Sequence, residues 1–255
     1  MKRKAIVNRR EQLFNIISSV EKLDTEAAAD MFNVSKETIR QDFLYLEERG
    51  IIEKVHGGAI LSNSNSVEDL LIRENENFLS KDKIVKKALE YVPKGECIVG
   101  LDTGSTAALL ASYLSKRSDL FIVSNSYRVM QSLANTNNRL LLLGGDYNKA
   151  EMAYYGEEIP HVLENITLDI YFVGTSGVKE RNGIQSRRFQ ESLIKKQILA
   201  RSSKKIVLAD SGKFQRTSLV EVAPWSMVDI LITDDGIPKD IKEKLESSVQ
   251  VVIAD

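Results

Sequence analysis

Between residues 10 and 50, apolar side chains recur every three or four positions, which is the spacing of one face of an α-helix. The pattern predicts three short helices. Their apolar positions are Leu13, Phe14, Ile17 and Val20 in the first, Ala27, Ala28, Met31 and Phe32 in the second, and Ile39, Phe43, Leu44 and Leu46 in the third. Asp24 and Ser35 suit the N-cap positions of the second and third helices. Asn33, which tolerates a left-handed backbone, predicts a tight turn between these two helices.

A short β-hairpin is predicted directly after the third helix. Gly50 suits the position after the helix end, and residues 51–55 and 59–61 have the composition of strands. Between them lies His56-Gly57-Gly58, a turn in which glycine can adopt positive φ. Three helices, a tight turn and a hairpin in this order predict a winged helix-turn-helix, whose second motif helix enters the DNA major groove.

The outward side of the third predicted helix carries polar side chains on its first two turns. They are Lys36, Thr38, Arg40 and Gln41. Lys and Arg bind guanine edges or phosphates, and Gln can bind adenine, so we expect these four residues to read bases. A basic segment precedes the first helix and would form either phosphate contacts or a solvated terminus. Its residues are Lys2, Arg3, Lys4, Arg9 and Arg10.

The charge of residues 1–60 limits how the predicted domain can bind DNA. Residues 1–60 contain ten Lys and Arg residues and ten Asp and Glu residues, so the predicted domain has no net charge. A general cationic surface is therefore excluded, and binding has to depend on local clusters of charge. We expect a homo-oligomer on a repeated DNA site, because a single domain would bind weakly.

From residue 83 onward, amphipathic helices alternate with short apolar strands, which indicates a mostly parallel sheet covered by helices. The predicted strands are residues 97–102, 120–124, 140–143, 170–174, 205–209, 230–233 and 249–253. The polar run at residues 62–66 has no periodicity and indicates a linker. We therefore expect an α/β protein with a small winged helix-turn-helix domain at residues 1–60, a linker at 61–79 and a larger α/β domain at 80–255.

Small polar sequences follow five of the predicted strands. They are Asp102-Thr103-Gly104-Ser105-Thr106, Ser124-Asn125-Ser126, Gly144-Gly145-Asp146, Thr175-Ser176-Gly177 and Asp210-Ser211-Gly212-Lys213. Because the carboxyl ends of parallel strands meet at one edge, these sequences should surround a pocket rich in hydroxyls and amides. The turn at residues 103–106 opens a helix whose first amides suit an anion such as phosphate, with a plain capped turn as the alternative. Lys213 would neutralise the same anion.

The remaining composition excludes several kinds of site. The chain of 255 residues has one cysteine, Cys97, so it has no internal disulfide, and the apolar run around this thiol predicts that it is buried. His56 and His161 are the only histidines, which leaves almost no ligands for a transition metal, and we expect neither metal nor cofactor. No apolar run approaches about 18 residues and no signal peptide pattern is present, so we expect a cytoplasmic protein without membrane contact.

Two sequence blocks between residues 34 and 59 are specific. VSKETIRQDFLYLEERG runs from residue 34 to residue 50, and KVHGGA from residue 54 to residue 59. Together they resemble the helix and wing signatures of the DeoR family of bacterial transcription regulators. Gln41 replaces an arginine of that family, and Lys54 with Val55 stands where its wing has an arginine, so the operator sequence does not carry over. The resemblance and the helix pattern together assign DNA binding to Ser35, Lys36, Thr38, Arg40, Gln41, Lys54, His56 and Arg3.

The second predicted domain carries six further blocks. They are LDTGST at 101–106, VSNS at 123–126, LLGG at 142–145, VGTSGV at 173–178, the Glu191 to Lys195 spacing and ADSGKF at 209–214. In this order they resemble the DeoR effector domain and, through it, the sugar phosphate isomerase superfamily. The resemblance implies a pocket for a phosphorylated sugar, lined by Asp102, Thr103, Gly104, Ser105, Thr106, Asn125, Thr175, Lys195, Asp210 and Lys213.

Two features of this domain have a second interpretation. Glu191 and Lys195 also fit a plain i,i+4 pair on an exposed helix, which would have no role in binding. Arg187 and Arg188 would form either a second anion contact or a solvated loop.

Three functions are compatible with these observations. The leading one is a DNA-binding repressor of carbohydrate-metabolism genes, whose operator binding is controlled by a phosphorylated sugar. The alternative is a sugar phosphate isomerase or deaminase with a DNA-binding appendage. Residues 175–177 lack the carboxylates that such isomerases present, so we expect no enzyme. In the third, the second domain only oligomerises and binds no ligand.

Overall fold

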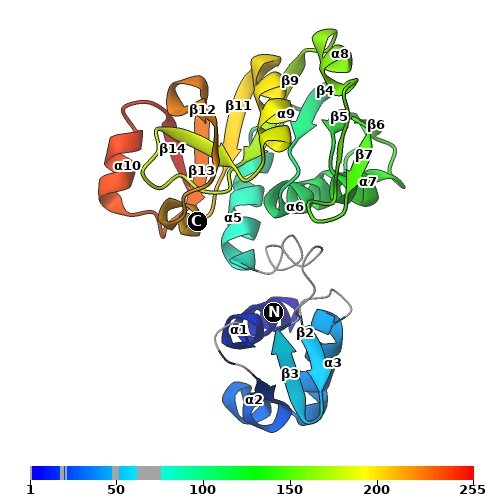
Figure 1. Cartoon of the computed structure of the whole chain (residues 1–255), viewed down its shortest axis with the longest axis vertical. Coiled ribbons are helices and arrows are strands. Elements are labelled where there is room, and N and C mark those ends of the chain that lie inside the picture. Colours follow the sequence, from blue (N-terminus) through cyan, green and yellow to red (C-terminus); the bar gives the residue numbers. More distant parts are fainter. Residues whose placement is uncertain (1, 18–19, 21, 48–51, 62–75) are drawn as a thin grey trace. The chain divides into compact units, whose positions relative to one another are not determined.

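The chain forms two compact units, each with its own core (Figure 1). The computed structural model describes residues 2–17, 20, 22–47, 52–61 and 76–255. The first unit contains the chain up to Leu79, and the second contains nearly all of the chain from Ser80 onward. Most of the expected linker, and the expected helix end at Gly50, lie outside the described residues, so the domain limits stay a prediction. Within the described part, none of the helices has the length and apolar character needed to span a membrane.

The first unit is a winged helix-turn-helix, as predicted. Its helices are α1 (Lys2–Ile17), α2 (Thr25–Phe32) and α3 (Lys36–Glu47). Its antiparallel sheet has the order β1-β3-β2, with β1 at Leu23–Asp24, β2 at Ile52–Val55 and β3 at Gly58–Leu61. The two-residue strand β1 was not predicted from the sequence. It pairs Leu23 with Ala59 and so joins the start of α2 to the wing.

The buried faces of the first two helices differ from the prediction. α1 ends at Ile17, and Val20 is 43% exposed. In α2 the buried residues are Ala28 and Ala29, whereas Met31 is 59% exposed. The expected Ala27 also lies on the surface. Because α2 starts directly after β1, its register is set by strand pairing, and in a short helix one residue of shift turns the buried face by about 100°.

In α3 the expected Leu44 is exposed, and a carboxylate takes a buried position instead. Ile39, Phe43 and Leu46 are buried as predicted. Asp42 is 1% exposed and lies on the same side, because it is three residues after Ile39 and four before Leu46.

The second unit is built on a seven-stranded parallel sheet, and all seven of its strands were predicted from the sequence. The strand order is β14-β13-β11-β9-β4-β5-β6. Every neighbouring pair in this sheet is parallel. The strands are β4 (Cys97–Leu101), β5 (Leu120–Ser124), β6 (Arg139–Leu142), β9 (Leu168–Gly174), β11 (Ser202–Leu208), β13 (Ile230–Asp234) and β14 (Gln250–Ala254).

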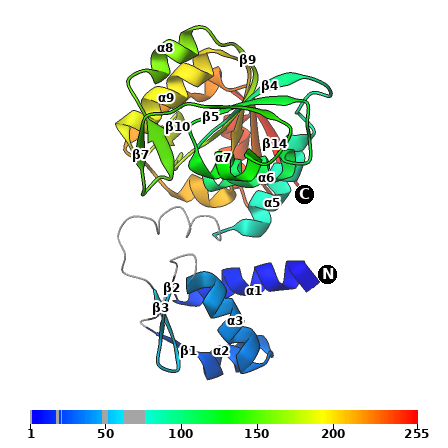
Figure 2. The ribbon, with the colours of Figure 1, turned by 90° about the vertical axis from the view of Figure 1, so that its right-hand side faces the viewer.

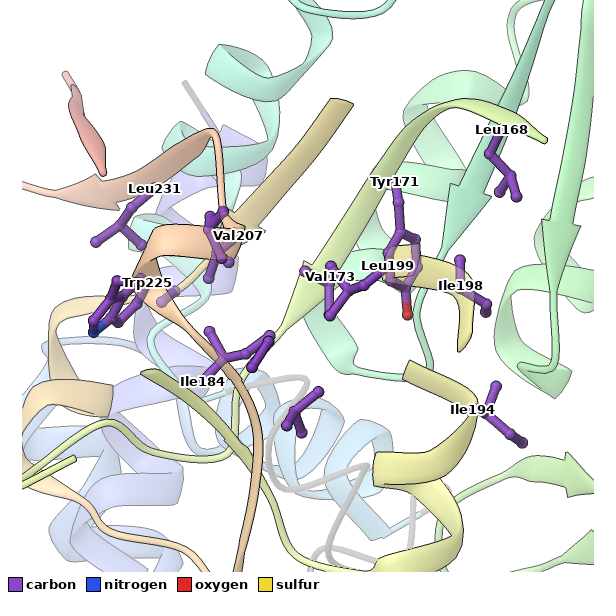
Figure 3. Packing of buried hydrophobic residues seen from close by; sticks show 14 of the residues in the cluster. Leu168, Tyr171, Val173, Ile184, Ile194, Ile198, Leu199, Val207, Trp225 and Leu231 are labelled. Atoms are coloured by element: carbon purple, nitrogen blue, oxygen red, sulfur yellow. The ribbon is translucent and has the colours of Figure 1, made fainter. Parts of the chain in front are cut away.

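Alternating residues of the strands send side chains into two separate apolar cores, one on each face. Ile170 and Phe172 face α5 (Phe78–Leu89), α6 (Ser105–Leu114) and α7 (Tyr127–Leu133). Tyr171 and Val173 face α8 (Ile159–Glu164) and α9 (Phe189–Ala200). Figure 2 shows these two groups of helices on opposite sides of the sheet. Figure 3 shows the α9 side, with Ile198 and Leu199 near Tyr171.

A hairpin, a two-stranded antiparallel sheet and a last helix complete the second unit. β7 (Asp146–Asn148) pairs with β8 (Ala153–Tyr155), and β10 (Gly183–Ser186) pairs with β12 (Val220–Pro224). Helix α10 spans Lys239–Leu245, and short 3₁₀ turns cover Ser211–Gln215 (η1) and Trp225–Met227 (η2). These four strands were not predicted, because strands of three to five residues give too few alternations to separate them from loops.

Candidate DNA-binding surface and effector site

The turn before α3 has the backbone geometry that the sequence predicts. Asn33 is left-handed, with φ 49° and ψ 51°, and its amide donates to the carbonyl oxygen of Asp30. Ser35 Oγ accepts a hydrogen bond from the Thr38 amide at 3.1 Å, which confirms its role as the N-cap of α3. The Ser35 and Thr38 hydroxyls also lie 2.8 Å apart. Both side chains therefore contribute to the cap.

The polar side chains of α3 that were expected to read bases lie on the surface of the unit. Lys36, Arg40 and Gln41 are exposed, and Thr38 is half-buried. Lys36 Nζ lies 2.5 Å from Glu26 Oε1 on α2. Arg40 Nη1 lies 3.4 Å from a carboxylate oxygen of Glu37, one turn earlier. The structure thus brings these residues onto one surface, where acidic neighbours accompany them.

The wing presents the other two expected DNA contacts, Lys54 and His56. Both are exposed, Lys54 on β2 and His56 in the turn to β3. Lys54 Nζ lies 2.8 Å from Glu47 Oε2, and the Lys54 amide donates to Glu47 Oε1 at 3.0 Å. The hydrogen bond from the Lys54 side chain lowers the pKa of Glu47, which favours the ionised carboxylate. Gly57 has φ 79°, which fits the predicted turn.

The basic segment does not form a free arm. Its residues belong to α1, which begins at Lys2, and the side chain of Arg3 lies outside the described residues. Arg9 Nε and Arg10 Nε donate to the two oxygens of Asp42, at 2.6 and 2.7 Å. The expectation of a solvated terminus is therefore wrong for Arg9 and Arg10, because a buried carboxylate binds both of them. A phosphate contact by these residues stays a prediction.

The strand order places the expected effector residues at one edge of the parallel sheet. The neighbouring strands β11, β9, β4 and β5 end at four of the polar sequences identified above. Asp210 follows β11, Thr175 follows β9, Asp102 follows β4 and Asn125 follows β5. All four are buried. The sheet topology thus brings these sequences together along its carboxyl edge.

The turn between β4 and α6 combines buried hydroxyls with an uncapped helix start. Thr103, Ser105 and Thr106 are between 5% and 9% exposed. Gly104 is the N-cap of α6, and no side chain caps the helix there. The first amides of an α-helix have no partner inside the helix, so this turn offers hydrogen-bond donors to an anion.

A buried cluster of charged groups lies next to this turn. Lys195 Nζ is 3.0 Å from Asp102 Oδ2 and 2.7 Å from Glu191 Oε1, and it donates to the Gly174 carbonyl oxygen at 3.2 Å. The interpretation of Glu191 and Lys195 as an exposed pair is therefore wrong, because both are buried. Burial alone would lower the pKa of Lys195, but Asp102 and Glu191 more than offset it and raise that pKa well above its usual value.

Two expected pocket residues hold neighbouring loops with their side chains. Asn125 Nδ2 donates to the Tyr154 carbonyl oxygen at 2.9 Å, which links the end of β5 to β8. Thr175 Oγ1 donates to the Gly177 carbonyl oxygen at 2.7 Å and accepts from the Gln185 amide at 3.0 Å. Their side chains support the loops at the carboxyl edge.

The last expected residues follow β11. Asp210 is the N-cap of η1 and accepts a hydrogen bond from the Gly212 amide at 3.2 Å. Lys213 Nζ lies 4.0 Å from Asp210 Oδ2, and its side chain is 14% exposed. Asp234, at the end of β13, was missed. It accepts hydrogen bonds from the Ser211 and Gly236 amides, and the rule that found the other polar strand ends would have found it.

Two pockets of the second unit lie away from the 103–106 turn. One, of 400 Å³, borders the expected Gly144-Gly145-Asp146 sequence and residues 155–159. The other, of 670 Å³, lies between residues 178–182 and α10. Arg187 is half-buried and Arg188, the N-cap residue of α9, is exposed. Among the described residues, no group of three or more His, Cys, Asp or Glu is arranged to hold a metal ion.

A winged helix-turn-helix joined to an α/β unit with polar strand ends defines a DNA-binding transcriptional regulator with a sensor domain. Residues 76–235 match the family model described as the DeoR C terminal sensor domain, and residues 9–65 match that of the DeoR-like helix-turn-helix domain. Because the sensor match alone covers more than half of the chain, the chain belongs to the DeoR family.

Curated relatives match nearly the whole chain. A putative aga operon transcriptional repressor of Escherichia coli O157:H7 is 28% identical, over 96% of this chain and 93% of its own length. An uncharacterized HTH-type transcriptional regulator, FruR, of Bacillus subtilis is 32% identical over 88% of this chain and 90% of its own length. The glycerol-3-phosphate regulon repressor of Escherichia coli K12 is 28% identical over 93% of this chain and 94% of its own length.

Proposed function

We propose that this regulator represses carbohydrate-metabolism genes and that a phosphorylated sugar in its second unit controls operator binding. The observation that carries the proposal is that one chain combines an exposed recognition helix with an uncapped, hydroxyl-rich helix start at the carboxyl edge of a parallel sheet. The first feature suits DNA and the second suits an anion. The names of two relatives, a glycerol-3-phosphate regulon repressor and an operon repressor, support this direction.

The phosphate would bind at the turn between β4 and α6. The first-turn amides of α6 and the hydroxyls of Thr103, Ser105 and Thr106 would donate to its oxygens. Lys213, which follows β11 at the same edge of the sheet, would supply positive charge. A dianion needs such donors, because its removal from water is costly unless each oxygen is hydrogen-bonded.

The sugar part would bind through polar groups of the same edge. Asp102 and Asp210 are acceptors for sugar hydroxyls, and both are already oriented by bonds to Lys195 and the Gly212 amide. Lys195 would then position Asp102, since its ammonium group already binds the carboxylates of Asp102 and Glu191. Asn125 and Thr175 would act in the same indirect way through the loops that they hold.

Control of DNA binding requires only that the sugar phosphate favour one arrangement of the units or subunits. A difference of about 1–3 kcal/mol between the two states changes operator affinity about 5- to 150-fold. The neutral charge of residues 1–60 makes a single winged helix-turn-helix a weak binder, so we propose that a homo-oligomer of this chain binds a repeated site in the cytoplasm.

The test is fluorescence anisotropy of promoter DNA with the full chain, with and without a panel of sugar phosphates. We expect at least one compound to change the DNA affinity, and the unphosphorylated sugar to have no effect. Lys213→Met should abolish the response while leaving DNA affinity without ligand unchanged. Lys239→Met, which removes an exposed lysine of α10, is the matched control. An affinity that no compound alters would contradict the proposal.

We propose further that the second unit binds its ligand without converting it. Proton abstraction from a sugar phosphate needs a base of suitable pKa next to the substrate carbon. Residues 175–177 are Thr, Ser and Gly, and the nearby Asp102 carboxylate is bound to Lys195 and to the Gly174 amide. Incubation of the full chain with ribose and hexosamine phosphates should leave them unchanged. Product formation above that of a Lys213→Met control would overturn this point.

A further inference from the structure

We propose that Glu37 is a specificity-determining residue of the recognition helix α3. In the free protein its carboxylate binds Arg40 and Gln41, and it releases them only to a DNA site that offers a hydrogen-bond donor to the carboxylate. The proposal rests on the DNA-binding role of this unit. It adds a residue that rejects DNA sequences with no hydrogen-bond donor in reach of its carboxylate.

The geometry of Glu37 supports this role. Glu37 lies in the first turn of α3 and is exposed. One carboxylate oxygen lies 3.4 Å from Arg40 Nη1, and the other accepts a hydrogen bond from Gln41 Nε2 at 3.1 Å. The bonds from Gln41 and Arg40 lower the pKa of Glu37. A single ionised carboxylate therefore holds both of the base readers in the second turn of the helix.

The same arrangement recurs on the rest of the reading surface. Lys36 is paired with Glu26, and Lys54 of the wing is paired with Glu47. Among the described residues, every lysine and arginine expected to contact DNA thus has an acidic partner. This pattern agrees with the zero net charge of residues 1–60, and it weakens the general attraction to phosphates.

Glu37 differs from the other two acidic residues because it lies in the first turn of α3, beside the expected base readers Arg40 and Gln41. A carboxylate accepts hydrogen bonds and repels phosphates and base acceptors such as guanine O6 and N7. In the major groove the donors are the amino groups of cytosine and adenine. Every base pair has one such amino group, so only its position can discriminate. A sequence that places the amino group away from Glu37 and turns acceptor atoms toward it leaves Glu37 bound to Arg40 and Gln41, and that sequence is rejected.

The experiment compares the full-length wild-type chain with Glu37→Gln, which keeps the size and removes the charge. Affinities are measured by fluorescence anisotropy for a mixed-sequence duplex and for a duplex that the wild-type chain selects from a random pool. Asp30→Asn, an equal change of charge at an exposed residue of α2, is the matched control. Each substitution is repeated in an Arg40→Ala chain, and thermal melting checks that each variant is folded.

We expect Glu37→Gln to raise the affinity for mixed-sequence DNA about fivefold, a modest effect because an exposed charge pair is screened by solvent. It should also lower the ratio of selected to mixed-sequence affinity, and both effects should shrink in the Arg40→Ala chain. Equal effects of Glu37→Gln and Asp30→Asn, or an effect independent of Arg40, would overturn the proposal. A wild-type chain that binds neither duplex would instead refute the DNA-binding function, and the proposal with it.

Discussion

Lys195 shows how a single buried cation can hold two elements of a fold together. It lies between two carboxylates that belong to different elements, Asp102 after β4 and Glu191 in α9. A charged group in a dry interior is costly without partners, and each member of the cluster here depends on the others. The Tyr171 hydroxyl, also buried, lies 3.5 Å from Asp102 and adds a donor on the other carboxylate oxygen.

Removal of this cation should destabilise the second unit strongly. In Lys195→Met, Asp102 and Glu191 would remain buried without a counter-charge, so the free energy of unfolding should fall by about 3–5 kcal/mol. Urea denaturation of the full chain measures the loss. Lys196→Met, at the exposed neighbouring position, is the control and should change stability by less than about 0.5 kcal/mol.

The pH dependence of this contribution follows from the direction of the pKa shift. The pKa of Lys195 is raised in the folded chain, so its stabilising effect is complete below the unfolded pKa of about 10.4 and is lost only as pH rises through the folded value. Titration of Lys195 should therefore not change the difference in the free energy of unfolding between wild type and Lys195→Met from neutral pH to about pH 9. A difference that already declines between pH 7 and pH 8 would contradict this assignment.

Cys97 gives a second prediction at the residue scale. The thiol is buried at the start of β4, and burial raises its pKa, which reduces the fraction of reactive thiolate. Ellman's reagent should therefore modify the folded chain much more slowly than the chain unfolded in urea. Rapid modification of the folded chain would show that the amino end of β4 opens readily.

At the scale of elements, the ion pairs between α1 and α3 hold the recognition helix in place. Arg9 and Arg10 reach Asp42 from α1, and the Arg10 guanidinium carbon lies 3.6 Å from the centre of the Tyr45 ring on α3. The Asp42 carboxylate is buried, and both arginines that pair with it among the described residues belong to α1. The orientation of α3 towards DNA therefore depends on α1.

Disruption of these ion pairs should loosen α3 and leave the salt dependence of DNA binding unchanged. Asp42→Ala should lower the stability of the first unit by about 1–3 kcal/mol, because two charged donors lose their acceptor. Hydrogen exchange of the α3 amides in the full chain measures this, with Asp30→Ala as control. Arg9→Gln should weaken DNA binding without changing its salt slope, whereas loss of a phosphate contact would reduce the slope by about one.

The elements that could be predicted from the sequence are those whose pattern is local. The seven sheet strands were found because each contains a short apolar run, and in the inner strands much of that run is buried. The strand β1 and the pair β10–β12 depend on partners that are distant in the chain, so their own residues carry little signal. The buried face of α2 was wrong for the same reason, since pairing of β1 fixes it.

In the candidate sites too, the features set by local contacts could be predicted and those set by distant contacts could not. Ser35 as a cap and the exposure of Arg40 and Gln41 follow from helix geometry within a few residues. The burial of Asp42 could not be predicted, because Arg9 lies 33 residues away in the chain. The pair of Lys195 with Glu191 is local, but its burial depends also on Asp102, which lies 93 residues before Lys195. The interpretation of Glu191 and Lys195 as an exposed pair failed for that reason.

At the scale of the whole molecule, the two units have cores that share no residues. The first unit has one small cluster, centred on Phe43 and Ile39. The second has two larger clusters, one on each face of the sheet. Small cores bury a smaller share of their surface and are less stable, so we expect the first unit to unfold at a lower temperature than the second.

Calorimetry of the full chain should therefore show two transitions, of which a sugar phosphate raises only the upper one. At a hundredfold excess over the dissociation constant, the ligand stabilises the unit that binds it by about 2.7 kcal/mol, which corresponds to about 5–10 °C for a unit of this size. The lower transition belongs to the winged helix-turn-helix and should move with DNA instead. Lys213→Met should remove the shift of the upper transition, and Lys239→Met should preserve it. If the sugar phosphate moved both transitions equally in the absence of DNA, the two units would unfold as one, and control of DNA binding would have to act through a shared core.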